Sequence, residues 1–332
     1  MFDVEDRGVS STETSTAKSI VTIGEIVVEI MAEEPGEGFR KALHLRGPFP
    51  SGAPAIFIDQ VARLGQKAGL ISCVGDDDFG RLNVERLGRD GVDTSAIRVD
   101  PDQVTGSAFV RYRPDGSRDF VFNIRNSACG QTRITGEGER LLDGCGHFHV
   151  MGSSLFSPGL IEQAAGAVDR VRSAGGTVSF DPNVRKEMLG APGMRAALGA
   201  MLRRCDVFMP SGPELTLLTQ AGSERDAVAE ILDLGVSAVV VKRGAEGASH
   251  HDRDGTIRMP AFAVREIDPT GAGDCFGATF VTCRFQGRSA ADSLRYANAS
   301  GARAVGVRGP MEGASSFAEL DAFIARHSGG AP

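Results

Sequence analysis

Strand-like and helix-like segments alternate along most of this chain, and this alternation is the feature that most limits its fold. In the C-terminal half, strands are predicted at residues 147–151, 177–180, 207–209 and 238–241. Helices are predicted between them at residues 160–174, 193–203, 214–219 and 226–234. Repeated strand–helix units indicate a mostly parallel sheet with helices on both faces. Ligands of such sheets bind at the carboxyl ends of the strands.

The N-terminal half predicts similar elements with one exception. Residues 20–30 are rich in β-branched side chains and predict a strand that ends near Gly24 or continues beyond it. A loop, a helix, a strand and a short helix are expected at 35–50, 53–64, 68–74 and 81–89. Residues 104–124 interrupt the α/β rhythm, because two strand-like runs flank Pro114-Asp115-Gly116 and predict a hairpin.

Near the C-terminus, a strand at 261–267 is expected to lead into a glycine-rich turn, followed by helices at 274–286 and 290–305. His250 and His251 lie in a polar stretch and are expected to be solvated. His147 and His149 alternate on one predicted strand and share a face. A metal site there is not favoured, because the sequence offers no third ligand of suitable spacing.

Composition excludes several classes of protein. The net charge of -7 and the absence of a long Lys/Arg run argue against nucleic acid as a partner. No apolar run is long enough for a membrane span. The six cysteines are scattered without a Cys-x-x-Cys pair, which predicts free thiols and a cytoplasmic location. Residues 1–19 are polar and predict a disordered tail ahead of a single domain at 20–328.

The stretch that carries chemistry is Asp268-Pro269-Thr270-Gly271-Ala272-Gly273-Asp274-Cys275-Phe276. A Gly-Ala-Gly turn allows its backbone N–H groups to approach a ligand closely, and a helix starting there would add its positive dipole end. That combination binds anions, above all phosphate. Asp274 would then serve as a general base that takes a proton from an attacking hydroxyl. The tetrapeptide alone is equally compatible with an ordinary loop in which Asp caps a helix.

The longer string Asp-x-Thr-Gly-Ala-Gly-Asp-x-Phe resembles the signature of the PfkB-type carbohydrate kinases, also called the ribokinase family. Five further segments resemble that family in the right order, at 62–65, 74–80, 179–185, 241–248 and 297–302. The resemblance covers Ser19 to about His327. It implies an α/β fold of the ribokinase type, a three-layer αβα sandwich with a mostly parallel central sheet. A small β lid would be built from about residues 27–49 and 104–128.

The resemblance also implies roles for single residues. Asp274 would be the base, and Gly271, Ala272 and Gly273 would form the anion hole for the transferred phosphate. The nucleotide would contact Lys242, Gly244, Gly247, Gly271, Gly273 and Asn298. The family uses Mg²⁺ held through water by a glutamate, here Glu214. The Asn that precedes this glutamate in the family is absent, and a helix-start Glu is an equal alternative.

Other implied roles concern the sugar and a second cation. Asp181 follows a predicted strand and would bind sugar, hold a phosphate-side metal through water, or only cap the turn. Arg185 would bind a phosphate or sugar oxygen, with a surface position as the alternative. A monovalent cation such as K⁺ is implied near Asp268, Thr270 and residues 306–309.

Two departures affect the sugar site. Glu29 stands where the family has an Asp that holds sugar hydroxyls. After Gly52, Ile56 replaces an Asn that also binds sugar, so an amide donor and acceptor are lost. Asp59, one helical turn later, is the candidate to replace it.

We therefore expect an ATP-dependent sugar kinase that phosphorylates a primary hydroxyl of a small carbohydrate, first of all the ketohexoses tagatose and fructose. 2-Keto-3-deoxygluconate is the alternative, because Arg111, Arg113, Arg125 and Arg185 could meet a carboxylate. A nucleoside comes third. A catalytically silent sugar- or nucleotide-binding regulator is the alternative of another class, and the intact Asp274 argues against it. The resemblance is compatible with a homodimer formed through the lid.

Overall fold

The computed structural model describes residues 18–114, 118–184 and 193–328. Within them, a large sheet runs through the molecule in the order β14-β13-β12-β11-β10-β9-β1-β4-β5, with β6 also paired to β4. Its strands are β1 (Ser19–Ile23), β4 (Ala68–Gly75), β5 (Val92–Asp93), β6 (Ile97–Asp100), β9 (Cys145–Met151), β10 (Thr177–Asp181), β11 (Val207–Phe208), β12 (Ala238–Lys242), β13 (Ala248–Asp252) and β14 (Gly255–Met259).

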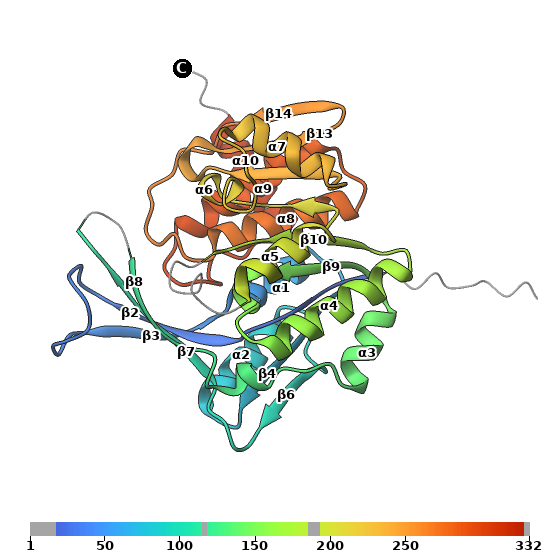
Figure 1. Ribbon diagram of the computed structural model, residues 1–332. Coiled ribbons are helices and arrows are strands. Elements are labelled where there is room, and N and C mark those ends of the chain that lie inside the picture. Colours follow the sequence, from blue (N-terminus) through green and yellow to red (C-terminus); the bar gives the residue numbers. More distant parts are fainter. Residues whose placement is uncertain (1–17, 115–117, 185–192, 329–332) are drawn as a thin grey trace, which may run out of the picture.

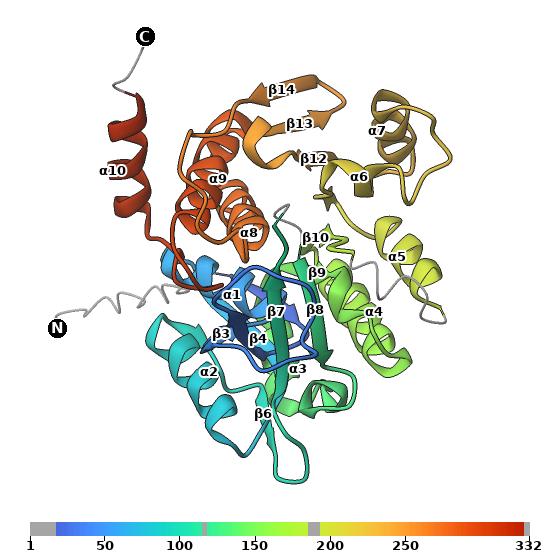
Figure 2. The same ribbon diagram turned by 90° about the vertical axis from the view of Figure 1, so that its left-hand side faces the viewer.

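The pairing of this sheet is parallel from β5 to β12, and β13 and β14 add an antiparallel edge. Helices cover both faces (Figures 1 and 2). They are α1 (Ala53–Arg63), α2 (Asp78–Arg89), α3 (Gly136–Asp143), α4 (Pro158–Ser173), α5 (Met194–Leu202), α6 (Gly212–Leu215), α7 (Glu224–Asp233), α8 (Ala272–Phe285), α9 (Ala290–Val305) and α10 (Phe317–Ser328).

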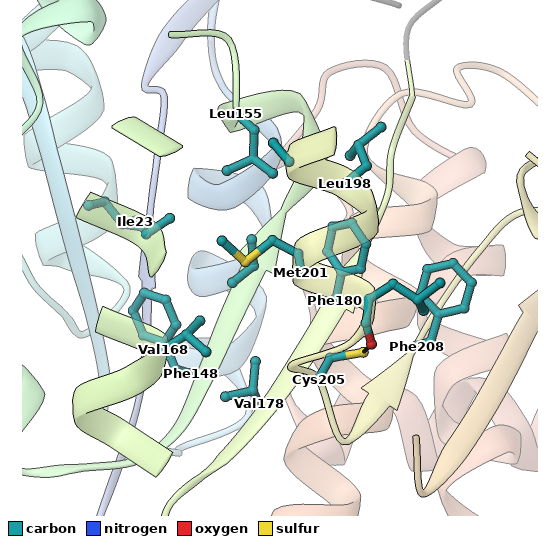
Figure 3. Packing of buried hydrophobic residues seen from close by; sticks show 14 of the residues in the cluster. Ile23, Phe148, Leu155, Val168, Val178, Phe180, Leu198, Met201, Cys205 and Phe208 are labelled. Carbon is teal, nitrogen blue, oxygen red and sulfur yellow. Dashed lines mark hydrogen bonds between the residues drawn. The ribbon is translucent and has the colours of Figure 1, made fainter. Parts of the chain in front are cut away.

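Alternation along the strands divides the core into two layers. Val21 and Ile23 of β1 point to one face, where they join side chains of α4, α5 and α7. Figure 3 shows part of this layer, with Phe148 and Val168 packed near Met201. Ile20 points to the opposite face and joins α1, α8 and α9. Both faces of the sheet are therefore buried, as parallel strands require.

A second, smaller sheet has the order β3-β2-β7-β8. It consists of β2 (Val27–Ala32), β3 (Leu45–Ser51), β7 (Gly106–Tyr112) and β8 (Arg118–Asn123). This lid sheet extends to one side of the large sheet (Figure 1). The α/β ribokinase-like fold with a small β lid, predicted from the sequence, is confirmed.

Several predicted elements are corrected. The predicted loop at 35–50 contains β3, and the predicted strand at 261–267 has no strand structure. The polar stretch around His250 forms the β13–β14 hairpin instead, so His250 and His251 are 4% and 8% exposed rather than solvated. The first strand ends at Ile23, in agreement with the first of its two predicted ends, and Gly24 with a φ of 156° turns the chain toward the lid sheet. The predicted disordered tail lies almost entirely outside the described residues.

Candidate active site

A cavity of about 1760 Å³ lies between the lid sheet and the carboxyl ends of the large sheet's strands. Its lid end is lined by Val27, Glu29, Ala108, Phe120 and Phe122. Its α9 end is lined by Asn298, Gly301, Ala302 and Val305. The volume exceeds that of most single-ligand pockets, so the cavity has room for two small molecules.

The Gly-Ala-Gly turn forms the start of α8 in the middle of this cavity. Gly271 is the N-cap residue with a φ of 80°, and a Cβ there would lie 2.2 Å from the Pro310 carbonyl oxygen. Gly273 lies in the first turn, where a Cβ would meet nothing nearer than the Lys242 Nζ at 3.9 Å. The first N–H groups of a helix lack partners within it, so this turn presents donors and open space to an anion.

Asp274 follows in the same turn, lines the cavity and is 8% exposed. The Asn183 side-chain amide lies 3.5 Å from its Oδ1. Lys242, from the end of β12, makes an ion pair with Asp181, from the end of β10. Burial opposes the charge on Lys242, but Asp181, Glu214 and Asp274 outweigh it and raise the pKa of Lys242 above its usual value. The charged ammonium group of Lys242 therefore lies near Asp274 and the Gly-Ala-Gly turn.

Glu214 lies near Lys242 and has a structural role there. Its Oε2 accepts a hydrogen bond of 2.7 Å from the Ser211 N–H, and its Oε1 accepts one of 2.6 Å from the Val184 N–H. The first bond completes a capping box at the start of α6. The carboxylate thus ties two loops together close to Lys242, which fits the helix-start alternative, while its predicted role toward Mg²⁺ remains a prediction.

Asp268 and Thr270 connect the α8 turn to the lid sheet. The Tyr112 hydroxyl donates to Asp268 Oδ1 at 2.5 Å, and the Arg118 guanidinium donates to Thr270 Oγ1 at 3.3 Å. The Gly309 N–H donates to Asp268 Oδ2 at 3.0 Å. Asp268 is 1% exposed, so this carboxylate is fully enclosed by its protein partners.

Polar groups at the lid end come from β2, from the end of β3, and from the segments that follow β1 and β9. Glu29 is 4% exposed, and its Oε2 accepts a hydrogen bond of 3.1 Å from Ser51. Glu25 accepts bonds of 2.9 Å from Ser153 and 2.5 Å from Ser154. Gly52 lies at the N-cap of α1, where a Cβ would meet the Glu25 carbonyl oxygen at 2.4 Å.

Two predicted sugar-binding residues, Asp59 and Arg113, are not brought to this end. Asp59 is 0% exposed and does not line the cavity; it faces Arg86 of α2 at 3.3 Å, and burial raises its pKa to about 8. Arg113 pairs with Asp119 across the lid hairpin at 2.7 Å, outside the cavity. Arg185 lies outside the described residues. The position one helical turn before Asp59, Ile56, does line the cavity, so the lost amide is replaced there by an apolar side chain.

The predicted nucleotide-binding residues line the cavity away from the lid. Gly244 and Gly247 have φ values of 54° and 92°. At Gly247 a Cβ would lie 2.1 Å from the Met259 carbonyl oxygen. Asn298 donates to the Met259 and Pro260 carbonyl oxygens at 3.3 and 3.0 Å, so its amide holds the segment that borders the cavity.

Some cavity residues were not predicted. Arg118, Phe120 and Phe122 alternate along β8 and line the cavity together. Their period of two along the predicted hairpin was the signal that could have identified them. Phe156 and Glu25 also line it; Glu25 belongs to the Gly24-Glu25 pair that resembles the family's first strand end, whereas nothing in the sequence around Phe156 marks that residue.

Metal binding by side chains alone is not indicated. Among the described residues, no group of three or more His, Cys, Asp or Glu side chains could hold a metal ion. His147 and His149 both bond the Ser179 hydroxyl at 2.7 Å and belong to the sheet interior. In the same part of the chain, no helix combines the length and apolar character needed to cross a bilayer.

The fold and this cavity define an α/β phosphotransferase with a lid. The chain belongs to the pfkB family of carbohydrate kinases, whose model matches residues 17–316. The class of enzyme expected from the sequence, a carbohydrate kinase, is thereby confirmed.

Among solved structures, the chain is similar to a provisionally named ribokinase II from E. coli in complex with ATP and Mg²⁺. The two share 50% identity over 93% of this chain and 100% of that one, with a TM-score of 0.88. The "Probable fructokinase-5" of Arabidopsis thaliana is 30% identical over 85% of this chain and 90% of its own length. The aminoimidazole riboside kinase of Salmonella typhimurium is 32% identical over 84% and 89%. These relatives differ in the acceptor that their names give.

Proposed function

We propose that this chain transfers the γ-phosphoryl group of ATP to the primary hydroxyl of a ketohexose, with tagatose or fructose as the preferred acceptors. The observation that carries the proposal is the position of Asp274. Its carboxylate lines the cavity in the first turn of α8, next to Gly271, Gly273 and the ammonium group of Lys242.

The residues of this turn divide the chemistry between them. Asp274 takes the proton of the attacking hydroxyl, which makes the oxygen a better nucleophile. The N–H groups of Gly271, Ala272 and Gly273 bind the negative charge of the moving phosphoryl group more strongly in the transition state. Lys242 adds a fixed positive charge, which its ion pair with Asp181 holds in place.

The cavity also fits the nucleotide and its metal. ATP would lie along Gly244 and Gly247, whose lack of side chains keeps the backbone accessible, toward Asn298 at the α9 end. Bound Mg²⁺ would neutralise charge on the phosphates. This ion is usually held by phosphates, waters and one or two carboxylates, so Asp181 and Glu214 are sufficient protein groups.

The lid end favours a neutral polyol. Glu29 and Glu25 are carboxylates that accept hydrogen bonds from hydroxyl groups, and both line the cavity. Phe120 and Phe122 offer apolar surface to the C–H face of a sugar ring. An acidic substrate would meet like charge from the two carboxylates, which disfavours its binding.

2-Keto-3-deoxygluconate remains a second candidate because Arg118 and Arg125 line the cavity. Both guanidinium groups already have partners, since Arg118 donates to Thr270 and Arg125 donates to the Phe156 carbonyl oxygen at 2.8 Å. We therefore place the neutral ketohexose first.

The test is a panel of acceptors assayed with ATP and Mg²⁺. Tagatose and fructose are expected to give the highest kcat/KM, followed by 2-keto-3-deoxygluconate and ribonucleosides. A preference of tenfold or more for the keto acid would replace the first choice by the second. Failure to phosphorylate any carbohydrate or nucleoside in the panel would contradict the proposal as a whole.

A further inference from the structure

The bond between Tyr112 and Asp268 joins two parts of the protein that are far apart in sequence. Tyr112 is the last residue of β7 in the lid sheet, and Asp268 precedes the anion-binding turn of α8. The hydroxyl donates to Asp268 Oδ1 at 2.5 Å and also lies 3.4 Å from Thr270 Oγ1. Arg118, on the neighbouring lid strand, donates to the same Thr270 oxygen at 3.3 Å.

The Asp268 carboxylate has little capacity left for another partner. Its Oδ1 also accepts the Thr270 N–H at 3.0 Å, and its Oδ2 accepts the Gly309 N–H at 3.0 Å. A carboxylate offers about four lone-pair positions, of which these described donors take three. With Tyr112 in this place, at most one lone-pair position of Asp268 is left for the monovalent cation that the family resemblance implies there.

Positive charge is already present at this position. The Arg118 guanidinium lies over the Phe120 ring, 5.4 Å from its centroid, and reaches Thr270 from the lid side. Together, the Tyr112 hydroxyl and the Arg118 guanidinium provide the donor and the charge that a cation would provide to the loop of Asp268 and Thr270.

We propose that Tyr112 is a positioning residue that orders the anion-binding turn from the lid and makes the enzyme independent of a monovalent cation. Closing of the lid and formation of the anion hole are then one event, because the same hydrogen bond belongs to both. The inference rests on the proposed function in so far as this turn binds the transferred phosphate.

The chain offers its own matched control. It contains two tyrosines. Tyr296 of α9 donates to Asp321 of α10, also at 2.5 Å, but does not line the cavity. Tyr112→Phe and Tyr296→Phe each remove one oxygen atom and one hydrogen bond to a carboxylate, and only the first lies next to the anion-binding turn.

The kinetic test compares the wild type and both variants in K⁺ and in tetramethylammonium buffer. We expect the wild type to change less than about twofold between the cations. Tyr112→Phe should lower kcat by about ten- to a hundredfold, with the KM for ATP changed less than threefold. The reason is that the lost bond positions the N–H groups that stabilise the transition state and contributes little to the binding of ATP. Tyr296→Phe should behave as the wild type.

A wild-type rate that falls tenfold or more without K⁺ would overturn the inference, as would a Tyr112→Phe variant that equals Tyr296→Phe. A second readout needs no turnover. Amide hydrogen exchange without ligands should be faster at 106–112 and 267–271 in Tyr112→Phe than in Tyr296→Phe. Equal exchange would also overturn the inference. If no acceptor is phosphorylated, the proposed function fails, but the difference in exchange still shows whether the Tyr112–Asp268 hydrogen bond orders the turn.

Discussion

Asp274 is the residue on which the proposed chemistry depends most. It is nearly buried, lines the cavity and lies one residue after the open space at Gly273. Asp274→Asn keeps the size of the side chain but removes the proton acceptor. We expect kcat to fall by about 10²–10⁴-fold while ATP affinity is largely kept. Steady-state kinetics and nucleotide titration measure the two effects.

Asp292→Asn is the matched control for that variant. Asp292 is also an acid in the first turn of a helix, α9, where it accepts a hydrogen bond from Ser289 at 2.6 Å outside the cavity. It should keep wild-type kcat. Normal turnover by a folded Asp274→Asn protein would remove this carboxylate from the mechanism.

Glu29 is the residue that should determine acceptor binding. It is buried at the lid end, with Ser51 as a partner. Loss of a buried hydrogen-bond partner costs roughly 1–3 kcal/mol. Glu29→Ala should therefore raise the KM for a ketohexose by about ten- to a hundredfold. Glu29→Gln, which keeps an acceptor oxygen, should raise it less, and no change in either variant would exclude Glu29 from the sugar site.

The two glycines at the start of α8 are needed for different reasons. At Gly271 the backbone itself excludes a side chain, since φ is positive and Pro310 lies in the way. At Gly273 the space is open, so no strain is expected there. Gly271→Ala should lower the unfolding midpoint. Gly273→Val should fold normally and lose activity, because its side chain enters the phosphate position.

Urea denaturation with activity assays separates the two glycine variants. An active Gly273→Val protein would show that the γ-phosphate reacts elsewhere.

The lid hairpin should change its dynamics when sugar binds. Residues 104–124 are expected to exchange amide hydrogens more slowly with bound sugar, because a lid closes to exclude water from phosphoryl transfer. The Tyr112 bond gives some protection before binding, so the sugar should add to it. Exchange measured with and without the acceptor is the check, and equal rates in both states would argue that this hairpin does not move.

The sequence predicts elements well where local pattern and tertiary role agree. The α9 helix begins and ends at the residues expected from periodicity, and the two strand-like runs of the predicted lid hairpin pair with each other. The β13–β14 hairpin was missed because His250 and His251 look polar in sequence, whereas strand pairing buries them. Asp59 was misplaced for a related reason: helical spacing predicts its face but not that Arg86 of α2 would pack against it.

At the scale of the whole molecule, two buried histidines should make stability depend on pH. Burial lowers the pKa of His147 to about 3 and that of His149 well below its usual value. Above about pH 6.5 both the folded and the unfolded chain are neutral at these sites. Between about pH 6.5 and 3 the unfolded chain binds the proton more readily, so the stability of the fold decreases as pH falls.

Urea unfolding at pH 7 and pH 5 tests this linkage in the wild type and His147→Gln. One such histidine contributes about 1.4 kcal/mol per pH unit inside the window. The wild type should therefore lose about 2 kcal/mol more than the variant between the two conditions. Identical losses would mean that His147 is not held neutral by the fold.

The order in which the parts of the cavity occur along the chain has an evolutionary consequence. The strands of the lid sheet all precede residue 124, whereas Lys242, Gly244, Gly247 and the α8 turn all follow residue 241. A gene crossover between these regions would exchange the acceptor-binding part and leave the phosphate-binding part intact. Acceptor preference could thus diverge by recombination among related kinases, provided that the hydroxyl–carboxylate contact across the new junction, Tyr112 to Asp268, is inherited as a pair.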